Sequence, residues 1–204
     1  MNTHLLLGFS ATALVSFAAH GAMITGATYK TTHDGSVEVE FVSQDAGAKG
    51  SLYFLGSVTG GTTTYAPSSD SNNLGQFLFQ NHGTSAGYTV YLGIFDAETT
   101  LYFAYKITHG VSVAPTGTIF RMDAPGDLLY FGQEVVLNTS EGSATRVWLE
   151  DIKNPSKSDW DYNDLAFDVN NSYVAPAPAP GAWALAIVGI LIGTRRYRPP
   201  ARRA

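Results

Sequence analysis

The sequence predicts an all-β protein built as an antiparallel β-sandwich with a jelly-roll-like arrangement. Between residues 22 and 172, apolar and polar residues alternate with period two over short runs, as in strands that bury one face. Glycine and asparagine residues separate these runs, and no stretch in this region has a helical period. Gly, Tyr and Phe are plentiful while charged residues make up 14%, which favours strands and turns. About ten short strands at regular spacing are typical of a sandwich.

The strands can be placed along the chain. Residues 36–43 alternate most clearly, with three apolar side chains on one face and two glutamates on the other. Further strands are expected at residues 51–55, 76–80, 88–95, 100–108, 118–122, 128–131, 134–138, 145–150 and 165–169. The strand at 100–108 carries aromatic rings on both faces, so we expect one face in the core and the other under a second packed layer.

The two ends of the chain have the composition of sorting segments. Residues 1–21 contain an apolar run and small residues suited to cleavage before Ala22, which indicates a signal peptide. After the β-domain at 22–172, residues 173–181 form a proline–alanine linker. Residues 182–194 form an apolar helix and residues 195–204 a basic tail. Because arginines stay on the cytoplasmic side of a membrane, this order predicts that the β-domain lies outside the cytoplasm.

The C-terminal order of spacer, apolar helix and arginine cluster resembles the PEP-CTERM sorting signal of Gram-negative bacteria. The resemblance covers about 25 residues, Ala179–Arg203, with Pro178 directly before them. The residues that carry it are Pro178, Pro180, Gly181, Trp183, Arg195 and Arg196. It departs where Pro-Ala-Pro-Gly stands in place of the usual Pro-Glu-Pro. The resemblance implies export, transient retention in the membrane, processing by an exosortase as partner, and a link to extracellular polysaccharide. A plain C-terminal membrane anchor is the alternative.

Charge and cysteine content exclude several classes of protein. All 17 acidic residues lie between Asp34 and Asp168, whereas five of the 12 basic residues lie in the last ten positions. Seven basic residues therefore oppose 17 acids in the β-domain, a net charge of −10 that repels nucleic acid and attracts cations. The absence of cysteine excludes disulfides and thiolate metal sites.

The densest group of acids lies just before the last expected strand and predicts a calcium site. Six acids fall between positions 150 and 168, opposed only by Lys153 and Lys157. Like charges this close repel each other unless a cation intervenes, and calcium takes six to eight oxygen ligands. The expected ligands are Glu150, Asp151, Asp159, Asp161, Asn163 and Asp164. The spacing departs from an EF-hand, since Asp164 stands at the turn glycine and Asn170 at the twelfth position.

A purely structural alternative exists for the same loop. Asp159 and Asn163 could form Asx-turns, and Asp161 could accept a hydrogen bond from a backbone amide. The Leu-Glu-Asp of 149–151 and the Asp-x-Asp-Tyr-Asn-Asp-Leu of 159–165 also resemble the end of an uncharacterised secreted bacterial β-domain family. That resemblance implies fold and export rather than a mechanism.

The sequence therefore favours a non-catalytic surface or matrix protein that calcium stabilises, and two alternatives stay open. In the first, exposed rings such as Tyr102 or Tyr105 make the domain a carbohydrate-binding module. In the second, the protein is a secreted hydrolase that uses His82 and Ser85, because residues 83–87 match G-x-S-x-G. That motif needs a helix after the serine, whereas a strand is expected there, so we interpret residues 83–87 as a hairpin loop.

Overall fold

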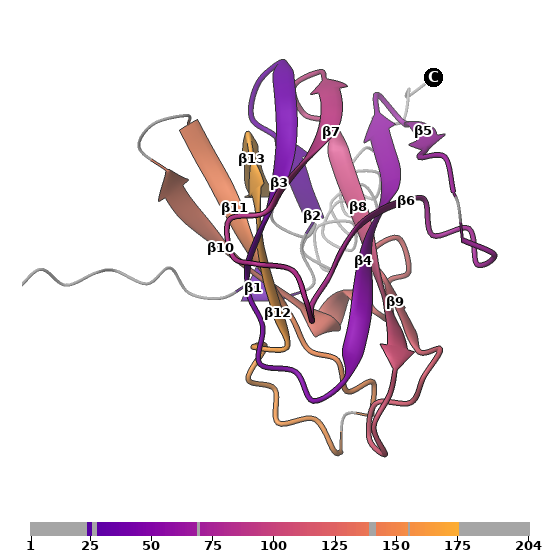
Figure 1. The fold of residues 1–204 in the computed structure, drawn as a ribbon. Helices are drawn as coiled ribbons and strands as arrows, with labels where there is room; N and C mark the ends of the chain where they lie inside the picture. Colours follow the sequence, from indigo (N-terminus) through magenta and orange to yellow (C-terminus); the bar gives the residue numbers. More distant parts are fainter. Residues whose placement is uncertain (1–23, 26–27, 69, 139–141, 155, 176–204) are drawn as a thin grey trace, which may run out of the picture.

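The protein is all-β, with two antiparallel sheets that pack face to face (Figure 1). The computed structural model describes residues 24–25, 28–68, 70–138, 142–154 and 156–175 of the 204-residue chain. Within these ranges one sheet has six strands in the order β1-β10-β11-β12-β3-β7. The second has seven, in the order β13-β2-β8-β4-β5, with β6 paired to β4 and β9 paired to β8. The prediction of an antiparallel β-sandwich is confirmed at this level.

The strands are mostly close to their predicted positions. Their bounds are β1 Ile24–Thr25, β2 Thr28–Thr31, β3 Gly35–Ser43, β4 Lys49–Thr59, β5 Thr62–Tyr65, β6 Gln76–Gln80, β7 Thr89–Phe95, β8 Thr100–His109, β9 Ile119–Arg121, β10 Phe131–Asn138, β11 Gly142–Leu149, β12 Leu165–Asn170 and β13 Ser172–Ala175. The sequence patterns did not predict β1, β2, β5 or β13. The last of these covers three residues that were expected in the linker, and it extends the domain because it pairs with β2.

The core lies between the sheets and is rich in aromatic side chains. The ring of Phe167 on β12 lies 5.4 Å from that of Phe103 on β8 and 6.4 Å from that of Phe79 on β6, measured between centroids. All three side chains are buried. Burying one such ring stabilises the fold by about 1.5–3 kcal/mol. These contacts hold the two sheets together and anchor β12, which borders the acidic loop.

The outer face of β8 carries a second apolar layer. Tyr102 and Ala104 point away from the core and pack with Tyr53, Leu55 and Leu74. Leu74 is buried although it lies in the loop between β5 and β6, so this loop covers part of the sheet. The predicted second packed layer is therefore present.

Two local expectations were wrong. The apolar run at 128–131 was expected as a strand, but Leu128–Tyr130 forms a 3-10 helix, η1, and Phe131 begins β10. Two backbone hydrogen bonds stabilise η1 and the turn before it: Asp127 N donates to Ala124 O (2.9 Å), and Tyr130 N donates to Asp127 O (3.1 Å). Residues 83–87 do not form a hairpin loop: β6 pairs with β4 in one sheet and β7 with β3 in the other, so the loop connects the two sheets.

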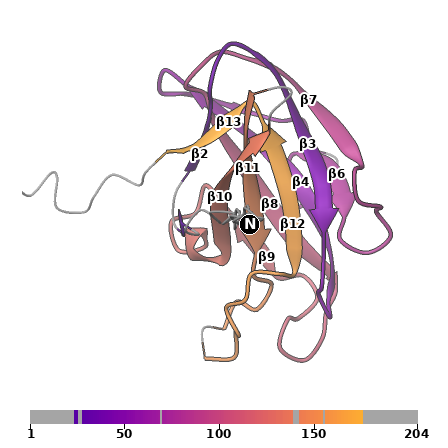
Figure 2. The same cartoon turned by 90° about the vertical axis from the view of Figure 1, so that its left-hand side faces the viewer.

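The acidic loop spans residues 150–164 between β11 and β12. It lies at the lower end of the sandwich in Figures 1 and 2, drawn in orange. Leu149 and Leu165 pair directly across the two strands, so Glu150 and Asp164 stand next to each other at the base of the loop. The register of the β11–β12 pair thus determines which carboxylates meet.

Candidate functional site: two sets of carboxylates in the β11–β12 loop

Aromatic residues fix the loop against the body of the sandwich. The ring of Trp160 stacks on Tyr130, with centroids 5.7 Å apart and planes 12° from parallel. The Tyr162 hydroxyl donates to Leu129 O (2.8 Å), and the Tyr130 hydroxyl donates to Lys153 O (2.6 Å). η1 therefore holds the first half of the loop at Lys153 and the second half at Trp160 and Tyr162.

The backbone of the loop is strained at two alternate residues, Trp160 and Tyr162. Trp160 and Tyr162 have φ angles of 56° and 54°, in the left-handed region that side chains other than glycine seldom adopt. Such a conformation costs about 1–2 kcal/mol per residue. The Trp160 ring packs on Tyr130 and on the Tyr162 ring, while Asp159 and Asp161 alternate with these aromatic residues and are exposed. Strain of this kind persists only where the surrounding structure holds it in place.

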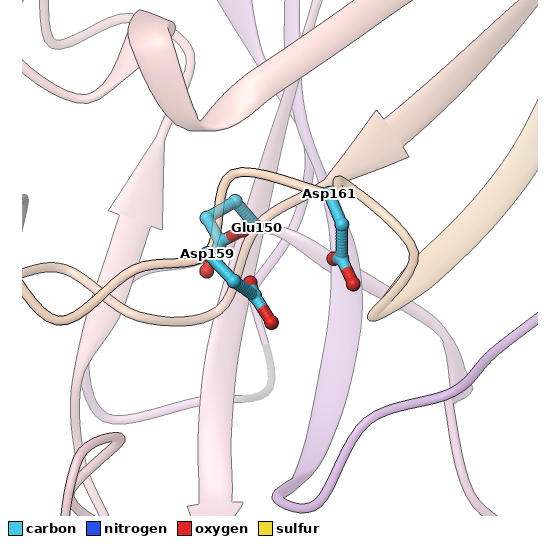
Figure 3. Close-up of side chains that lie close together, drawn as sticks. All are labelled: Glu150, Asp159 and Asp161. Atoms are coloured by element: carbon cyan, nitrogen blue, oxygen red, sulfur yellow. The ribbon is translucent and has the colours of Figure 1, made fainter.

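The first set of carboxylates consists of Glu150, Asp159 and Asp161 (Figure 3). One oxygen from each lies within 4.8 Å of the others. Glu150 directly follows β11 and is buried, whereas the two aspartates come from the second half of the loop. Two oxygens that bind one calcium ion at 2.3–2.6 Å lie at most about 5 Å apart, so the spacing fits a common ion. We refer to these three residues as the outer set.

The second set consists of Glu150, Asp151 and Asp164, and its oxygens also lie within 4.8 Å of one another. Asp164 Oδ2 accepts a hydrogen bond from Asp151 N (2.7 Å), which closes the base of the loop. Glu150 is 0% exposed and Asp151 is 3% exposed. We refer to these three residues as the inner set; it shares Glu150 with the outer set.

Burial raises the pKa of every member of the inner set. The pKa of Asp151 rises to about 6 and that of Asp164 to about 7, in both cases first through burial and then through neighbouring carboxylates. The pKa of Glu150 is also raised, again mainly by burial, although a hydrogen bond from Ser158 opposes the shift. In the absence of a cation these groups are thus disfavoured as anions.

Two oxygens of the inner set have no hydrogen-bond partner among the described residues. They are Glu150 Oε2 and Asp151 Oδ2, and the hydroxyl of Tyr105 is buried and unpartnered in the same way. The charges of Asp151 and Asp164 contribute to a strongly raised pKa of Tyr105, so this hydroxyl lies near the inner set. A buried carboxylate oxygen without a partner is costly, which makes such an oxygen a marker of a missing ligand.

The two lysines of the loop do not neutralise these carboxylates. Lys153 Nζ forms an ion pair with Asp127 (2.6 Å) and also donates to Ile119 O (2.9 Å). Lys157 is exposed and forms no ion pair within the described residues. The charge of the two sets is therefore open to an external cation, and carboxylate oxygens are the ligands that hard divalent cations prefer.

Five of the six predicted ligands belong to the two sets. The sixth, Asn163, lies beside the outer set: its backbone amide and its Nδ2 both donate to the carboxylate of Asp161, at 3.3 and 2.7 Å. The structural alternative is thus partly realised, since Asp161 does accept a backbone amide. It accounts for Asp161 and Asn163 but not for the buried oxygens of Glu150 and Asp151. Sequence patterns missed Ser158 and Tyr105 as neighbours of the site, since neither type of residue marks a calcium loop.

None of the residues expected for carbohydrate binding or for hydrolysis belongs to the two sets of carboxylates. Tyr105 is fully buried and cannot stack on a sugar, so it is not part of the exposed platform that the carbohydrate-binding alternative requires. Tyr102 is half-buried and lines a hollow on the outer face of the second sheet. His82 Nε2 lies 3.0 Å from Ala46 O, and β7 follows Ser85 where a hydrolase elbow needs a helix.

The sorting segments lie outside the described residues. These are the signal peptide at 1–21, most of the linker, the helix at 182–194 and the basic tail, including Pro178, Pro180, Gly181, Trp183, Arg195 and Arg196. Within the part of the chain that the structure describes, no helix has the length and apolar character needed to cross a membrane. No family model, no curated protein and no solved structure matches this chain.

Proposed function

We propose that this chain is an exported, non-catalytic surface or matrix protein whose β-sandwich is stabilised by calcium bound in the β11–β12 loop. The observation that carries the proposal is the pair of buried carboxylate oxygens without partners, Glu150 Oε2 and Asp151 Oδ2. Each of these two residues also places a carboxylate oxygen within 4.8 Å of oxygens from further carboxylates. A cation would satisfy these oxygens and would remove the repulsion among their charges.

Calcium suits this loop better than the other common divalent cations. All the candidate ligands are oxygens, and no cysteine is present in the chain. Oxygen ligands of varied spacing suit calcium, which accepts six to eight of them in flexible geometry, whereas magnesium requires a near-ideal octahedron. Zinc prefers nitrogen and sulfur ligands in a tetrahedron.

The role of the ion in this proposal is structural. Glu150 follows β11 directly, Asp164 precedes β12 directly, and Asp159 and Asp161 come from the loop between them. An ion bound to these residues would tie the ends of two paired strands to the loop. It would also hold the strained backbone at Trp160 and Tyr162.

Export and sorting belong to the proposal through the chain ends. The apolar run in 1–21 supports export, and the spacer, apolar helix and arginines of 173–204 support retention at the membrane and processing by an exosortase-type enzyme. The jelly-roll-like connectivity, the signal helix, the C-terminal helix and a link to exopolysaccharide remain predictions. Fractionation of cells that express the full chain tests this part, and a purely cytoplasmic protein would contradict it.

Isothermal titration calorimetry of the purified full-length chain tests the calcium site. We expect calcium to bind in the wild type, with magnesium competing weakly, and to bind at least about tenfold more weakly to Asp161→Asn. The matched control is Asp96→Asn, since Asp96 is exposed and its side chain forms no ion pair among the described residues. The absence of calcium binding in the wild type would reject the proposal.

A carbohydrate-binding function is the second candidate, and one observation favours it. Tyr65 is 69% exposed and lines two hollows of about 200 and 620 Å³ on the outer face of the second sheet. Tyr102 and Asp123 line the smaller hollow, and Arg121 lines the larger one. An exposed ring beside planar polar groups is suited to stacking on a sugar and hydrogen-bonding its hydroxyls.

Affinity electrophoresis in gels that contain neutral polysaccharides tests this candidate. Retardation of the wild type that is lost in Tyr65→Ala or Tyr102→Ala would support it. Tyr91→Ala is the control, because Tyr91 is also exposed but lies on β7 of the other sheet. Equal retardation of all three variants would reject the hollow as the binding site.

A further inference from the structure

We infer that the β11–β12 loop binds two neighbouring divalent cations, with Glu150 as a ligand shared between an outer and an inner position. This inference rests on the proposed function and deepens it, because the sequence indicated only a single ion. The outer position would be formed by Glu150, Asp159 and Asp161, and the inner position by Glu150, Asp151 and Asp164.

The geometry separates the carboxylates into two groups rather than one. Oxygens bound to one calcium ion at 2.3–2.6 Å lie within about 5 Å of one another. The oxygens of the five acids meet this condition only as two sets of three, and Glu150 is the member common to both. A single ion placed in the outer set would leave Asp151 and Asp164 outside its coordination, and the reverse holds for Asp159 and Asp161.

The inner position has its own evidence of a missing ligand. Glu150 and Asp151 are at least 97% buried, and each has one oxygen without a partner among the described residues. The outer set alone cannot satisfy Asp151 Oδ2, because Asp151 does not belong to it. The backbone contact from Asp151 N holds Asp164 Oδ2 at the same place, so the inner set is positioned before any ion arrives.

The surroundings of the inner set are consistent with a partly enclosed ion. The Tyr105 hydroxyl is buried near Asp151 and Asp164 and has no partner within the described chain. Gly50 allows this placement: a Cβ at that position would collide with the Tyr105 ring and hydroxyl. The hydroxyl can donate a hydrogen bond to a carboxylate or to a water molecule on the ion.

The charges of the two sets also favour two ions over one. The five ionised carboxylates carry five negative charges, so one divalent ion leaves three of them uncompensated and two ions leave one. No lysine or arginine of the described chain forms an ion pair with any of these five groups. Uncompensated charge is most costly on the buried side, where the inner set lies.

The stoichiometry of binding to the full-length chain tests the inference. Equilibrium dialysis with calcium should give two ions per wild-type chain. Asp164→Asn should bind one, and the double variant Asp159→Asn with Asp161→Asn should also bind one. Glu150→Gln should weaken both positions by about tenfold or more, since it removes a ligand from each. Asparagine at 164 keeps an oxygen that can accept from Asp151 N, and circular dichroism of each variant checks that the sheet is retained.

Terbium luminescence gives an independent readout of proximity. Trp160 lies between Asp159 and Asp161 and should sensitise terbium at the outer position. Energy transfer from terbium to a second, different lanthanide on the same chain should occur in the wild type and be lost in Asp164→Asn. One calcium ion per wild-type chain, or two ions that persist in Asp164→Asn, would overturn the inference but leave the proposed function intact. No calcium ion at all would reject both.

Discussion

The acids of the β11–β12 loop differ sharply from the acids on the rest of the sandwich. Among the described residues outside the loop, five acids meet a basic side chain at close range, in the pairs Glu98–Lys30 (3.2 Å), Asp70–Lys106 (2.9 Å), Asp123–Arg121 (2.8 Å), Asp127–Lys153 (2.6 Å) and Asp168–Arg146 (2.8 Å). Inside the loop, Glu150, Asp151 and Asp164 meet one another instead. The two acids that are buried in the described chain, Glu150 and Asp151, are thus without a basic partner.

The pKa values follow the same division. The hydrogen bond from Lys106 lowers the pKa of Asp70, whereas burial raises the pKa of Asp151 and of Asp164. A protein that places its own cations beside five acids and none beside Glu150, Asp151 or Asp164 leaves the compensation of that charge to something external.

Glu150→Gln is expected to have the largest effect. With calcium at about 100 times its dissociation constant, the loss of the bound ions should reduce the free energy of unfolding by about 2–3 kcal/mol. In chelator the same change should have little effect, because it removes one member of a repelling group. Urea unfolding under both conditions measures the difference, and an equal loss in both would show that Glu150 acts through packing alone.

The pH dependence of the metal-free protein should be of intermediate size. An aspartate whose pKa is about 3.8 in the unfolded chain and about 6 or 7 in the folded protein binds its proton more tightly when folded. Its contribution to stability is complete below about pH 4 and is lost as the pH rises toward 7. Urea unfolding in chelator should therefore show lower stability at pH 8 than at pH 5.

The variant Asp164→Asn should flatten this dependence, because it removes the group with the higher pKa. A metal-free wild type that is more stable at pH 8 than at pH 5 would contradict the arrangement of the inner set. Saturating calcium should remove the loss at high pH, since the ion binds the ionised carboxylates.

Asp168→Asn tests an acid that has a basic partner outside the loop. The carboxylate of Asp168 accepts two hydrogen bonds from Arg146, at 2.8 and 2.9 Å, across β11 and β12. Both side chains are partly exposed, so we expect a loss of about 1 kcal/mol, the upper range for an exposed pair. The loss should be the same with calcium and with chelator, and a calcium-dependent loss would connect this pair to the loop.

Asp96→Asn should have the smallest effect. The side chain is exposed between β7 and β8 and is not part of either set. Exposed substitutions away from such features usually change stability by no more than about 0.5 kcal/mol. Urea unfolding should give that small change with or without calcium, and a larger one would mean that long-range charge alone affects this domain.

Features that depend on residues close together in the chain could be predicted from the sequence. The alternation in 36–43 and 76–80 predicted β3 and β6, and the acids of the loop could be recognised as one group. The same patterns wrongly predicted a strand at residues 128–130. A short apolar run has the same sequence pattern in a strand and in a 3-10 turn that buries one ring.

Burial of the carboxylates could not be predicted from the sequence. Glu150 and Asp151 are as polar as Asp159 and Asp161, and only the fold separates them. Tyr105 of β8 lies near the inner set, and its ring fits only because Gly50 of the neighbouring strand β4 has no side chain. Contacts between segments about 50 and 100 residues apart leave no local pattern, so the division into an inner and an outer set appears only in three dimensions.

Thermal unfolding of the full-length chain at a series of free calcium concentrations tests whether the loop acids depend on an external cation. If calcium binds only the folded protein, the melting temperature should rise steadily with calcium above the dissociation constant. At about 100 times that constant we expect roughly 5–10 °C over the value in chelator, for a domain of about 150 residues. A melting temperature that is the same in calcium and in chelator would show that the buried carboxylates of Glu150 and Asp151 are stable without an ion.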